Sequence, residues 1–548
     1  MVRDWLSTCV SSHPNCSSQS ANSGWLPSRL VDVGCGSAPS APRLCLRDEI
    51  PPASPYLTLS HCWGASLTSK LTLSTLAQFR RAIPASALPR TYVDAIAVAR
   101  FLGVRHLWID SLCIVQDSAR DWAAECSTMG RVYAGALCSV AAAAARSGAG
   151  GCFASRHPTC LQPLVLETTT TTTTTTKTTT KTLRRARWSV GAAAGADELV
   201  PQANAPLHAR GWVLQERFLA ARVVHFGRDR VFWECARGAA AEGEPAVRPS
   251  RRLLFLPRWD AARGEAVGLA FDAFLYWDLL VDAYAETALT MEKDKLPAFS
   301  GIAKAMAPHL GFGAGSGVAY LAGLWSWRLA GQLLWSVPGG GTRVRGRAPS
   351  WSWASVEGQL YMSTGKLNAV RRSDGDYLFD ILRCETFPVG EDEFQEVKGG
   401  CIRGTGWLWK IPDARKLLNG PDYLTPRFAD GKGQTIPATF DEKNTERSVQ
   451  FLLPIQCLEY GSIEGLILER CETLPGQFVR IGHFSAASQW MGESPDLQEA
   501  LLRMLKYVEG FGLVRPDTCD FEHRIKDQRF ETEEAPLLGE YLYTITIV

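Results

Sequence analysis

Short apolar runs alternate with helix-like segments early in the chain. Residues 56–60, 104–109 and 136–144 form three short apolar runs, which are typical of buried strands. Between them, residues 91–102 and 118–133 carry apolar side chains at the spacing of one helix face. Because strand, helix, strand, helix and strand follow in this order, the pattern predicts an α/β domain with a parallel sheet covered on both faces.

The same domain continues further along the chain. Residues 209–219 have a helical pattern, and residues 222–235 form two apolar runs around Gly227. Two such runs separated by a short polar turn indicate a β-hairpin. We therefore expect residues 56–235 to form one α/β domain that a hairpin closes, with residues 1–55 as a helix followed by loop.

A low-complexity tract interrupts this domain. Residues 168–182 are threonine except at Lys177 and Lys181, and an Ala/Gly-rich stretch follows. Such a composition has no periodicity that could build a core. The sequence thus predicts a disordered surface insertion over residues 167–205.

The pattern of apolar residues divides the rest of the chain into two parts. Within residues 236–345, the segments 272–288 and 295–307 have a helical pattern. This part of the chain is expected to pack on the first domain. Residues 346–548 contain short apolar runs punctuated by glycine, proline and aspartate, which predict a strand-rich, mixed α+β domain. The period of two in Trp351-x-Trp353 predicts a strand with both rings on one face.

Composition narrows the class of protein. Hydrophobic residues make up 46% of the chain and charged residues 21%, as in soluble globular proteins. The formal net charge is only +2, so the sequence predicts neither nucleic-acid binding nor attraction to an anionic membrane. It has no apolar run long enough to span a bilayer and no apolar segment near its first residue. We therefore expect a cytoplasmic protein.

Cysteine is the other compositional signal. The chain has 16 cysteines, too few for a disulfide scaffold of 548 residues, and reduced thiols are expected. Cys9, His13 and Cys16 have a spacing that suits zinc, with Cys35 as a candidate fourth ligand. The alternative is a helix end with small buried thiols. Because the local run supplies only three ligands, the sequence assigns no metal.

Unusual polar and aromatic residues follow the predicted strands. In open α/β sheets, ligands bind at the carboxyl ends of the strands. The first strand is followed by a Ser-His-Cys-Trp-Gly run and the second by an aspartate, while an arginine and a tryptophan open the later helix. The ligand-binding candidates are Ser60, Cys62, Trp63, Gly64, Asp110, Gln116, Arg210 and Trp212.

Three segments of this domain resemble the signature blocks of the fungal heterokaryon-incompatibility (HET) domain. The blocks are YLTLSHCWG, LPRTYVDAIAVARFLGVRHLWIDSLCIVQDSARDWAAECSTMGRVYAGA and ARGWVLQERFLAARVVHFGRDRVFWEC, in that order within residues 56–235. Two later segments, LTMEKDKLPAFSGIAKAM and APSWSWASVEG, resemble the regions that accompany HET domains. The resemblance implies a role in nonself recognition, in which the activated domain triggers growth arrest and programmed cell death.

HET domains in turn look like remote relatives of TIR domains, flavodoxin-like α/β modules of which some hydrolyse NAD. In those enzymes the catalytic glutamate follows a tryptophan by four residues, and Trp212 and Glu216 reproduce this spacing, with Val213 where cysteine is usual. The resemblance therefore implies Glu216 as the catalytic residue and NAD as the substrate, and it implies no cofactor. One carboxylate could stabilise the oxocarbenium-like cation formed when nicotinamide leaves ribose.

Other interpretations stay open at this point. Glu216 could form a structural ion pair with Arg210, Arg217 or Arg222, and Asp110 could cap the segment after its strand. Adjacent strand residues point to opposite faces, which argues against activation of Cys62 by its neighbour His61. The alternative function is a non-catalytic signalling or scaffold module that acts by oligomerising or by docking to a protein partner. A regulatory or decayed copy is a third interpretation.

Overall fold

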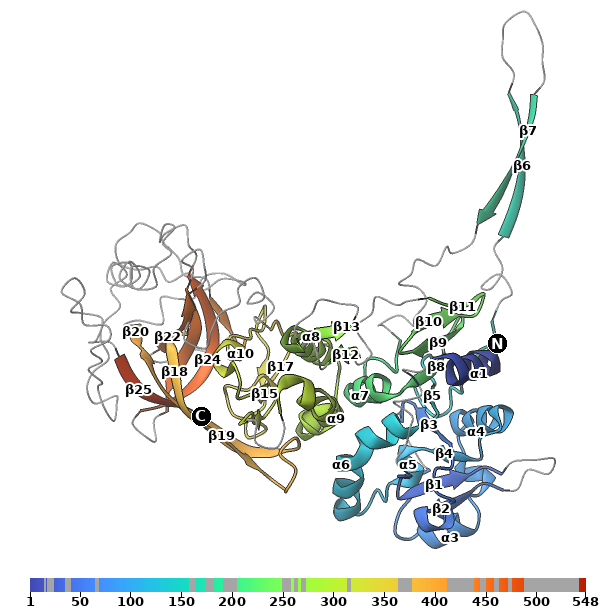
Figure 1. Ribbon diagram of the computed structural model, residues 1–548, viewed down its shortest axis with the longest axis horizontal. Helices are drawn as coiled ribbons and strands as arrows, with labels where there is room; N and C mark the ends of the chain where they lie inside the picture. The colour runs from blue at the N-terminus through green and yellow to red at the C-terminus, as the bar shows by residue number, and fades with distance from the viewer. Residues whose placement is uncertain are drawn as a thin grey trace, which may run out of the picture. The chain divides into compact units, whose positions relative to one another are not determined.

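The description rests on a computed structural model of the chain, which divides into two compact units, Met1–Leu256 and Pro257–Val548 (Figure 1). Each unit is described by itself. Only the backbone is described for residues 164–172, 182–190, 258–260 and 265–267. The residues that the structure describes are 1–13, 16, 24–34, 41–64, 69–156, 164–172, 182–190, 205–248, 258–260, 265–267, 273–312, 317–362, 377–411, 438–443, 450–457, 463–471, 476–486 and 542–548.

The first unit is built around one large mixed sheet with helices on its faces. Its strands are β1 (Arg29–Asp32), β2 (Arg43–Leu46), β3 (Tyr56–Ser60), β4 (His106–Trp108), β5 (Cys138–Ala141), β8 (Arg222–Phe226), β9 (Val231–Cys235), β10 (Gly238–Ala241) and β11 (Glu244–Arg248). Its α-helices are α1 (Val2–Ser12), α3 (Leu76–Arg81), α4 (Arg90–Leu102), α5 (Asp110–Cys113), α6 (Ala119–Gly135) and α7 (Gly211–Leu219).

The nine strands lie in the order β11-β10-β9-β8-β5-β3-β4-β1-β2. The central strands β8, β5, β3 and β4 are parallel, whereas the strands outside them pair antiparallel. The predicted α/β class with a parallel sheet is therefore confirmed at this level. The predicted hairpin is confirmed as well, because β8 and β9 pair antiparallel with Phe226 opposite Val231.

Strand β3 lies near the middle of the sheet and is paired on both sides by parallel strands. All five of its residues are buried, which explains why it has no polar alternation. Its side chains divide between two helices. Tyr56 donates a hydrogen bond from its hydroxyl to the Val132 carbonyl of α6 at 2.8 Å. His61, one residue past the strand, contacts Tyr92 of α4, so α6 and α4 cover opposite faces.

Local signals set the ends of these two helices. Ser118 precedes α6 and its hydroxyl accepts a hydrogen bond from the Asp121 amide, as an N-cap does. Gly103 ends α4 in the left-handed conformation at φ 76°, where glycine avoids the steric cost that a Cβ would add. The end of α4 and the start of α6 thus lie where the sequence predicted them, whereas α6 continues to Gly135, past the predicted end at 133.

The sheet extends beyond the boundaries expected from the sequence. Residues 1–55 were expected to form a helix and then loop, but β1 and β2 pair with each other and β1 pairs with β4. At the other edge, β10 and β11 extend the sheet to Arg248, past the expected limit at 235. β1, β2 and β11 contain charged residues and β10 is Gly-Ala-Ala-Ala, so none of them presents an apolar run like those of β3 and β5.

The threonine-rich insertion also differs from the expectation. Residues 164–172 (β6) and 182–190 (β7) pair as an antiparallel hairpin, although disorder was expected over 167–205. Threonine is β-branched and favours extended backbone, which is the physical reason that such a tract can pair. The expected disorder at 173–181 and 191–204 lies outside the described residues.

The second unit combines helices with a strand-rich part. Its longer helices are α8 (Ala273–Ala285) and α9 (Pro297–Met306), which lie within the two segments predicted to be helical. An eight-stranded sheet follows in the order β18-β19-β25-β24-β23-β22-β20, with β21 paired to β24. The strands of this sheet are β18 (Phe379–Pro388), β19 (Val397–Trp407), β20 (Trp409–Ile411), β21 (Ala438–Phe440), β22 (Gln450–Cys457), β23 (Ile463–Arg470), β24 (Gln477–Ala486) and β25 (Leu542–Ile547).

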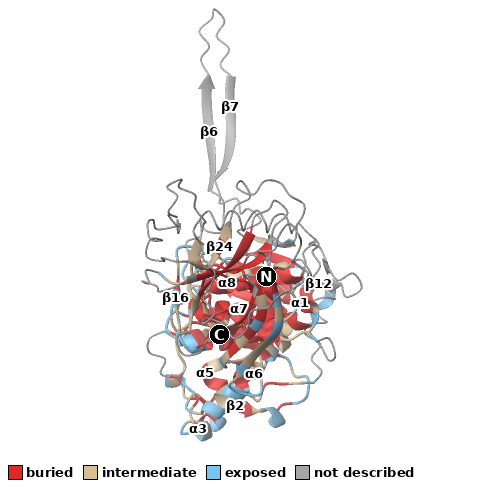
Figure 2. Ribbon diagram, turned by 90° about the vertical axis from the view of Figure 1, so that its left-hand side faces the viewer, coloured by how far each residue is buried: buried red, intermediate tan, exposed pale blue. Residues whose placement is uncertain are grey.

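Tryptophan builds the core between α8 and the segment before this sheet. Most of α8 is buried (Figure 2), and its Trp277 packs edge-on against Trp325 at 5.3 Å between ring centroids. Trp351 and Trp353 are both fully buried, but they do not lie on one strand as predicted. Trp353 begins a 3₁₀ turn that ends at Ser355, because Ser352 caps this turn by accepting a hydrogen bond from the Ala354 amide.

A buried ionic group ties this core to the sheet. Arg480 and Asp441 are fully buried and contact each other through two pairs of atoms at 3.2 Å. Arg343 donates to the same carboxylate at 2.9 Å. Two guanidinium groups thus share one carboxylate away from water.

Among the described helices, none combines the length and the apolar character that crossing a bilayer requires.

Replacement of Asp441 by alanine leaves two buried guanidinium groups without their shared carboxylate. We expect Asp441→Ala to lower the free energy of unfolding of the second unit by about 3–5 kcal/mol. Urea titration of the full chain, followed by tryptophan fluorescence, measures this change. Asp380→Ala removes an exposed carboxylate on β18 and should change the same quantity by less than about 0.5 kcal/mol. Equal effects of the two variants would contradict the prediction.

Candidate functional site

The candidate residues gather where the parallel strands end. Along the chain, β3 pairs first with β4 on one side, and β5 then pairs with it on the other. The connections after β3 and β5 thus leave in opposite directions, which makes the carboxyl ends of these two strands a topological switch point. Ser60 ends β3, and its hydroxyl lies 3.4 Å from that of Ser139 on β5. Ligands of open α/β sheets bind in such places.

Glu216 of α7 reaches this point from the helix above the strands. It is 5% exposed, and its carboxyl group interacts with the hydroxyls of Ser60 and of Tyr133 on α6. Its Oε2 atom is buried and has no hydrogen-bond partner among the described residues. A serine, a tyrosine and a glutamate from three different elements therefore form one buried polar group.

The surroundings change the acidity of this glutamate. Burial raises the pKa of Glu216 to about 7, and the nearby charge of Asp110 acts in the same direction. The hydroxyls of Ser60 and Tyr133 and the charge of Arg210 oppose this rise but do not cancel it. The carboxyl group therefore exchanges a proton near neutral pH, which is the range a general acid or base uses.

Two of the three neighbouring arginines are bound elsewhere. Arg217 donates to Glu234 of β9 through Nε at 2.7 Å and also through its terminal nitrogen. Burial would raise the pKa of Glu234, but Arg217 and His225 hold it well below its usual range. Arg222 points to the sulfur of Cys9. Among the described residues Glu216 thus takes part in no ion pair, which argues against the structural-pair interpretation for these two arginines.

Arg210 is the remaining arginine, and it lies close to the site. It precedes α7 as its N-cap residue and is half-buried. Its charge acts on Glu216, on Cys62 and on His61, so Arg210 lies near this group of side chains. An anionic ligand group at the carboxyl end of β3 could meet this cation.

Asp110 forms the second part of the site. It is the first residue of α5, immediately after β4, and its Oδ2 accepts a hydrogen bond from the Trp63 indole at 2.8 Å. Its Oδ1 accepts from the Ser111 amide at 2.6 Å and lies 3.9 Å from Nδ1 of His61. Asp110 is the first helical residue of α5, whose N-cap is Ile109, so its contact with the next amide is not a helix cap. The indole contact fixes an aromatic ring beside the strand ends.

A hydrogen-bonded chain runs behind Asp110 on the α4 face. Nε2 of His61 lies 3.0 Å from the Tyr92 hydroxyl, which lies 2.5 Å from the Ser111 hydroxyl. Burial lowers the pKa of His61, so this ring is neutral near pH 7. The sequence analysis did not select Tyr92 or Tyr133, because a tyrosine on an apolar helix face looks like a core residue until its hydroxyl partner is known.

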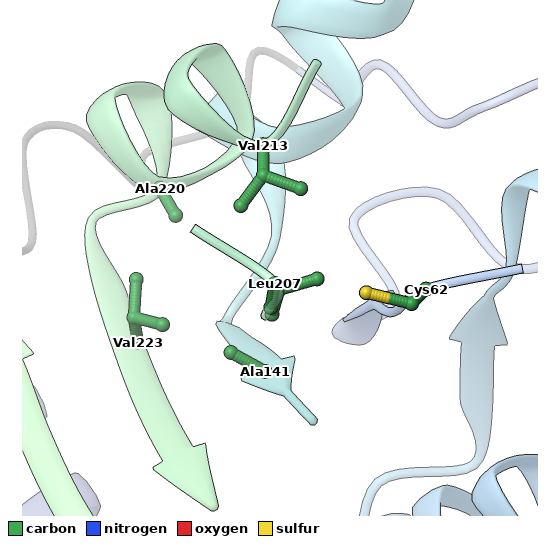
Figure 3. Close-up of a cluster of buried hydrophobic side chains, with 6 residues drawn as sticks. All are labelled: Cys62, Ala141, Leu207, Val213, Ala220 and Val223. Carbon is green, nitrogen blue, oxygen red and sulfur yellow. The ribbon is translucent and has the colours of Figure 1, made fainter. Parts of the chain in front are cut away.

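The other candidates fall into structural roles. Cys62 belongs to an apolar cluster with Leu207 and Val213 and points toward Leu207 (Figure 3). Burial raises the pKa of its thiol, and its neighbour His61 contacts α4 instead, as the alternation of strand side chains predicted. Gln116 donates its amide to the carbonyls of Asp110 and Ile114, so it holds the loop after β4.

Gly64 and Trp212 are the remaining two candidates. Gly64 has φ +75°, and a Cβ there would come within 2.6 Å of the Ser147 Cβ, so only glycine fits. Trp212 packs edge-on against Trp122 of α6 at 6.3 Å. It is half-buried, as are Trp63, Asp110 and Arg210.

Comparison with known families identifies this part of the chain. Residues 56–216 match the family model described as "Heterokaryon incompatibility protein (HET)". The chain contains a HET domain. The matched segment begins at the first residue of β3 and ends at Glu216, so it contains both halves of the candidate site. No curated protein and no solved structure matches the chain significantly.

The raised pKa of Glu216 makes the stability of the HET domain depend on pH. The folded state holds the proton up to about pH 7, whereas a glutamate in an unfolded chain loses it near 4.5. Folding therefore becomes less favourable as pH rises between these values. Relative to Glu216→Gln, we expect the wild-type domain to lose about 2–3 kcal/mol of unfolding free energy between pH 5 and pH 8.

Denaturant titrations of the two full-length proteins at pH 5 and pH 8 measure this difference. Glu125→Gln provides a second comparison, since Glu125 is equally buried on α6 and burial raises its pKa too, but Arg29 at 3.2 Å opposes this rise. A difference between wild type and Glu216→Gln that stays constant with pH would show that Glu216 does not titrate in this range.

Proposed function

We propose that this chain is a heterokaryon-incompatibility effector of a filamentous fungus, which promotes programmed cell death in nonself recognition by hydrolysing NAD at Glu216. The match of residues 56–216 to the HET family supports the biological role. The observation that carries the chemical role is Glu216 itself, a buried carboxyl group with a pKa near 7 at the switch point of a parallel sheet.

The arrangement of the sheet also supports a relation to flavodoxin-like and TIR domains. The four parallel strands, numbered along the chain, lie in the order 2-1-3-4. Flavodoxin-like sheets begin with the same order and bind their ligand at the switch between the first and third strands. Glu216 lies at the corresponding place, between β3 and β5.

The proposed reaction needs few groups. The bond between ribose C1′ and the nicotinamide nitrogen breaks, nicotinamide leaves with the electron pair, and the oxygen of water forms the new bond to C1′. In its ionised form Glu216 stabilises the oxocarbenium-like cation, and the attacking water releases one proton to solvent. The hydroxyls of Ser60 and Tyr133 hold the carboxylate in place.

The half-buried residues would bind the rest of the substrate. Trp63 and Trp212 offer rings on which a base can stack, and Arg210 offers a guanidinium for a phosphate group. Glu216 is only 5% exposed, so a substrate reaches it only when the side chains around it move. Such a requirement suits an effector that is activated by a protein partner or by association with further copies.

The decisive experiment compares full-length wild type with Glu216→Gln in yeast cells after induced expression. We expect wild type to consume NAD and arrest growth, and Glu216→Gln to lose NAD consumption at least 100-fold with growth restored. Glu125→Gln should behave as wild type. Folding of each variant is checked by limited proteolysis of the purified protein.

The same comparison decides the alternative function. Growth arrest that persists in Glu216→Gln while NAD stays unchanged in both proteins would contradict NAD hydrolysis. It would favour a non-catalytic scaffold that acts by oligomerising or by docking to a partner.

The pH dependence of the reaction follows from the same pKa. Because the carboxylate form of Glu216 is the active one, we expect kcat/KM to rise tenfold per pH unit below about pH 7 and to level off above it. Initial rates of nicotinamide release by the purified full chain, measured from pH 5.5 to pH 8.5, test this. A profile that falls through pH 7 would assign Glu216 the role of an acid instead.

A further inference from the structure

Four potential zinc ligands meet near the amino ends of the parallel strands, opposite the end where Glu216 lies. Cys9, His13 and Cys16 come from α1 and the turn after it, and Cys235 ends β9. One ligand atom from each of these residues lies within 4.8 Å of the other three. Cys35, the fourth ligand considered from the sequence, lies outside the described residues.

The spacing of these atoms suits a tetrahedral metal ion. With Zn–S bonds of about 2.3 Å and Zn–N bonds of about 2.05 Å, tetrahedral angles place sulfur and nitrogen about 3.6 Å apart. The Cys235 Sγ and His13 Nδ1 atoms are 3.6 Å apart. Three sulfur atoms and one imidazole nitrogen form a donor set typical of structural zinc.

The backbone holds the first three ligands on one side. Cys9 and His13 are four residues apart and share a face of α1, where the His13 amide donates to the Cys9 carbonyl at 3.2 Å. The Cys16 amide donates to the His13 carbonyl at 3.0 Å, which turns Cys16 back toward the same point. The local chain therefore presents three ligands before any metal is bound.

The groups around the cluster donate hydrogen bonds to two of its sulfur atoms. The backbone amides of Ala236 and Arg237 hydrogen-bond to the Cys16 sulfur, and Nε of Arg222 donates to the Cys9 sulfur at 3.2 Å. Arg222 is 1% exposed. A divalent cation with three thiolates has a net charge of −1, and the buried guanidinium beside it brings the group to zero.

We propose that Cys9, His13, Cys16 and Cys235 bind one Zn²⁺ ion as a structural site. All four positions come from the protein, so no open position is left for a substrate. The site lies at the amino edge of the parallel strands, where Arg222 begins β8 and donates to the Leu137 carbonyl before β5. It is thus separate from the Glu216 site at the carboxyl edge and does not depend on the proposed function.

The metal would fix α1 to the edge of the sheet. Trp5 of α1 packs against Trp233 of β9 with 6.2 Å between ring centroids. Its indole donates to the Pro245 carbonyl at 2.7 Å. The ring contact and the proposed ion join α1 to β9, while the hydrogen bond to Pro245 joins α1 to β11. Removal of the ion should therefore loosen α1 before the rest of the domain.

The test is metal analysis of the purified full chain. We expect one zinc per chain, and one cobalt after exchange, with the strong near-ultraviolet absorption of a cobalt thiolate. Cys235→Ser and His13→Ala should weaken zinc binding about 100-fold or more in competition with a chromogenic chelator. Cys45→Ser is the matched control and should keep the metal. Cys45 is a buried cysteine on β2, the outermost strand on the side of the sheet away from β9.

His13 is only half-buried at the end of α1, so its substitution should disturb folding less than substitution of the buried cysteines. His13→Cys replaces one zinc ligand by another and should retain the ion where His13→Ala loses it. Hydrogen exchange of α1 should increase after chelation in wild type and should be unchanged by chelator in His13→Ala. Zinc at less than a tenth of an equivalent after reconstitution, or a mass two daltons low from a disulfide within the cluster, would overturn the proposal.

Discussion

The parallel pairing of β3 on both sides is the constraint from which the rest of the first unit follows. A strand paired by β4 and β5, with α6 on one face and α4 on the other, has no contact with water along its five residues. Burial favours apolar or internally hydrogen-bonded side chains along it, although the Thr58 hydroxyl has no hydrogen-bond partner among the described residues. Ser60 brings a polar side chain to its carboxyl end, and that end is where the connections of the neighbouring strands separate.

One buried carboxylate in each unit is paired with arginine. Glu234 has Arg217 and His225 as partners, and Asp441 has Arg343 and Arg480. Each of these carboxylates is held by cations, as the cost of burying a charge demands.

Glu216 differs because its direct partners are hydroxyl groups, which do not neutralise a negative charge. Its raised pKa is the consequence, and a proton is kept where a counter-ion would otherwise be needed. A structural carboxylate gains nothing from this arrangement, whereas a carboxyl group that must change its protonation state or meet a cationic transition state does.

The sequence by itself determined the alternation of strands and helices, the closing hairpin, the end of α4 and the start of α6, because these depend on periodicity and on capping residues close in the chain. It also selected Ser60 and Asp110 from their positions after predicted strands, and Glu216 from the resemblance to TIR domains. It did not predict β1, β2, β10 and β11, because charged residues or a Gly-Ala run leave no clear apolar pattern there.

The tertiary structure alone decided which side chains meet. Tyr133 and Glu216 lie on different helices, and only the packing of α6 beside α7 over β3 brings both to Ser60. Cys235 and Cys9 are more than two hundred residues apart in the chain. They meet because α1 packs against β9. Periodicity records how a segment faces its surroundings, but a polar contact between distant segments leaves no periodic trace in either of them.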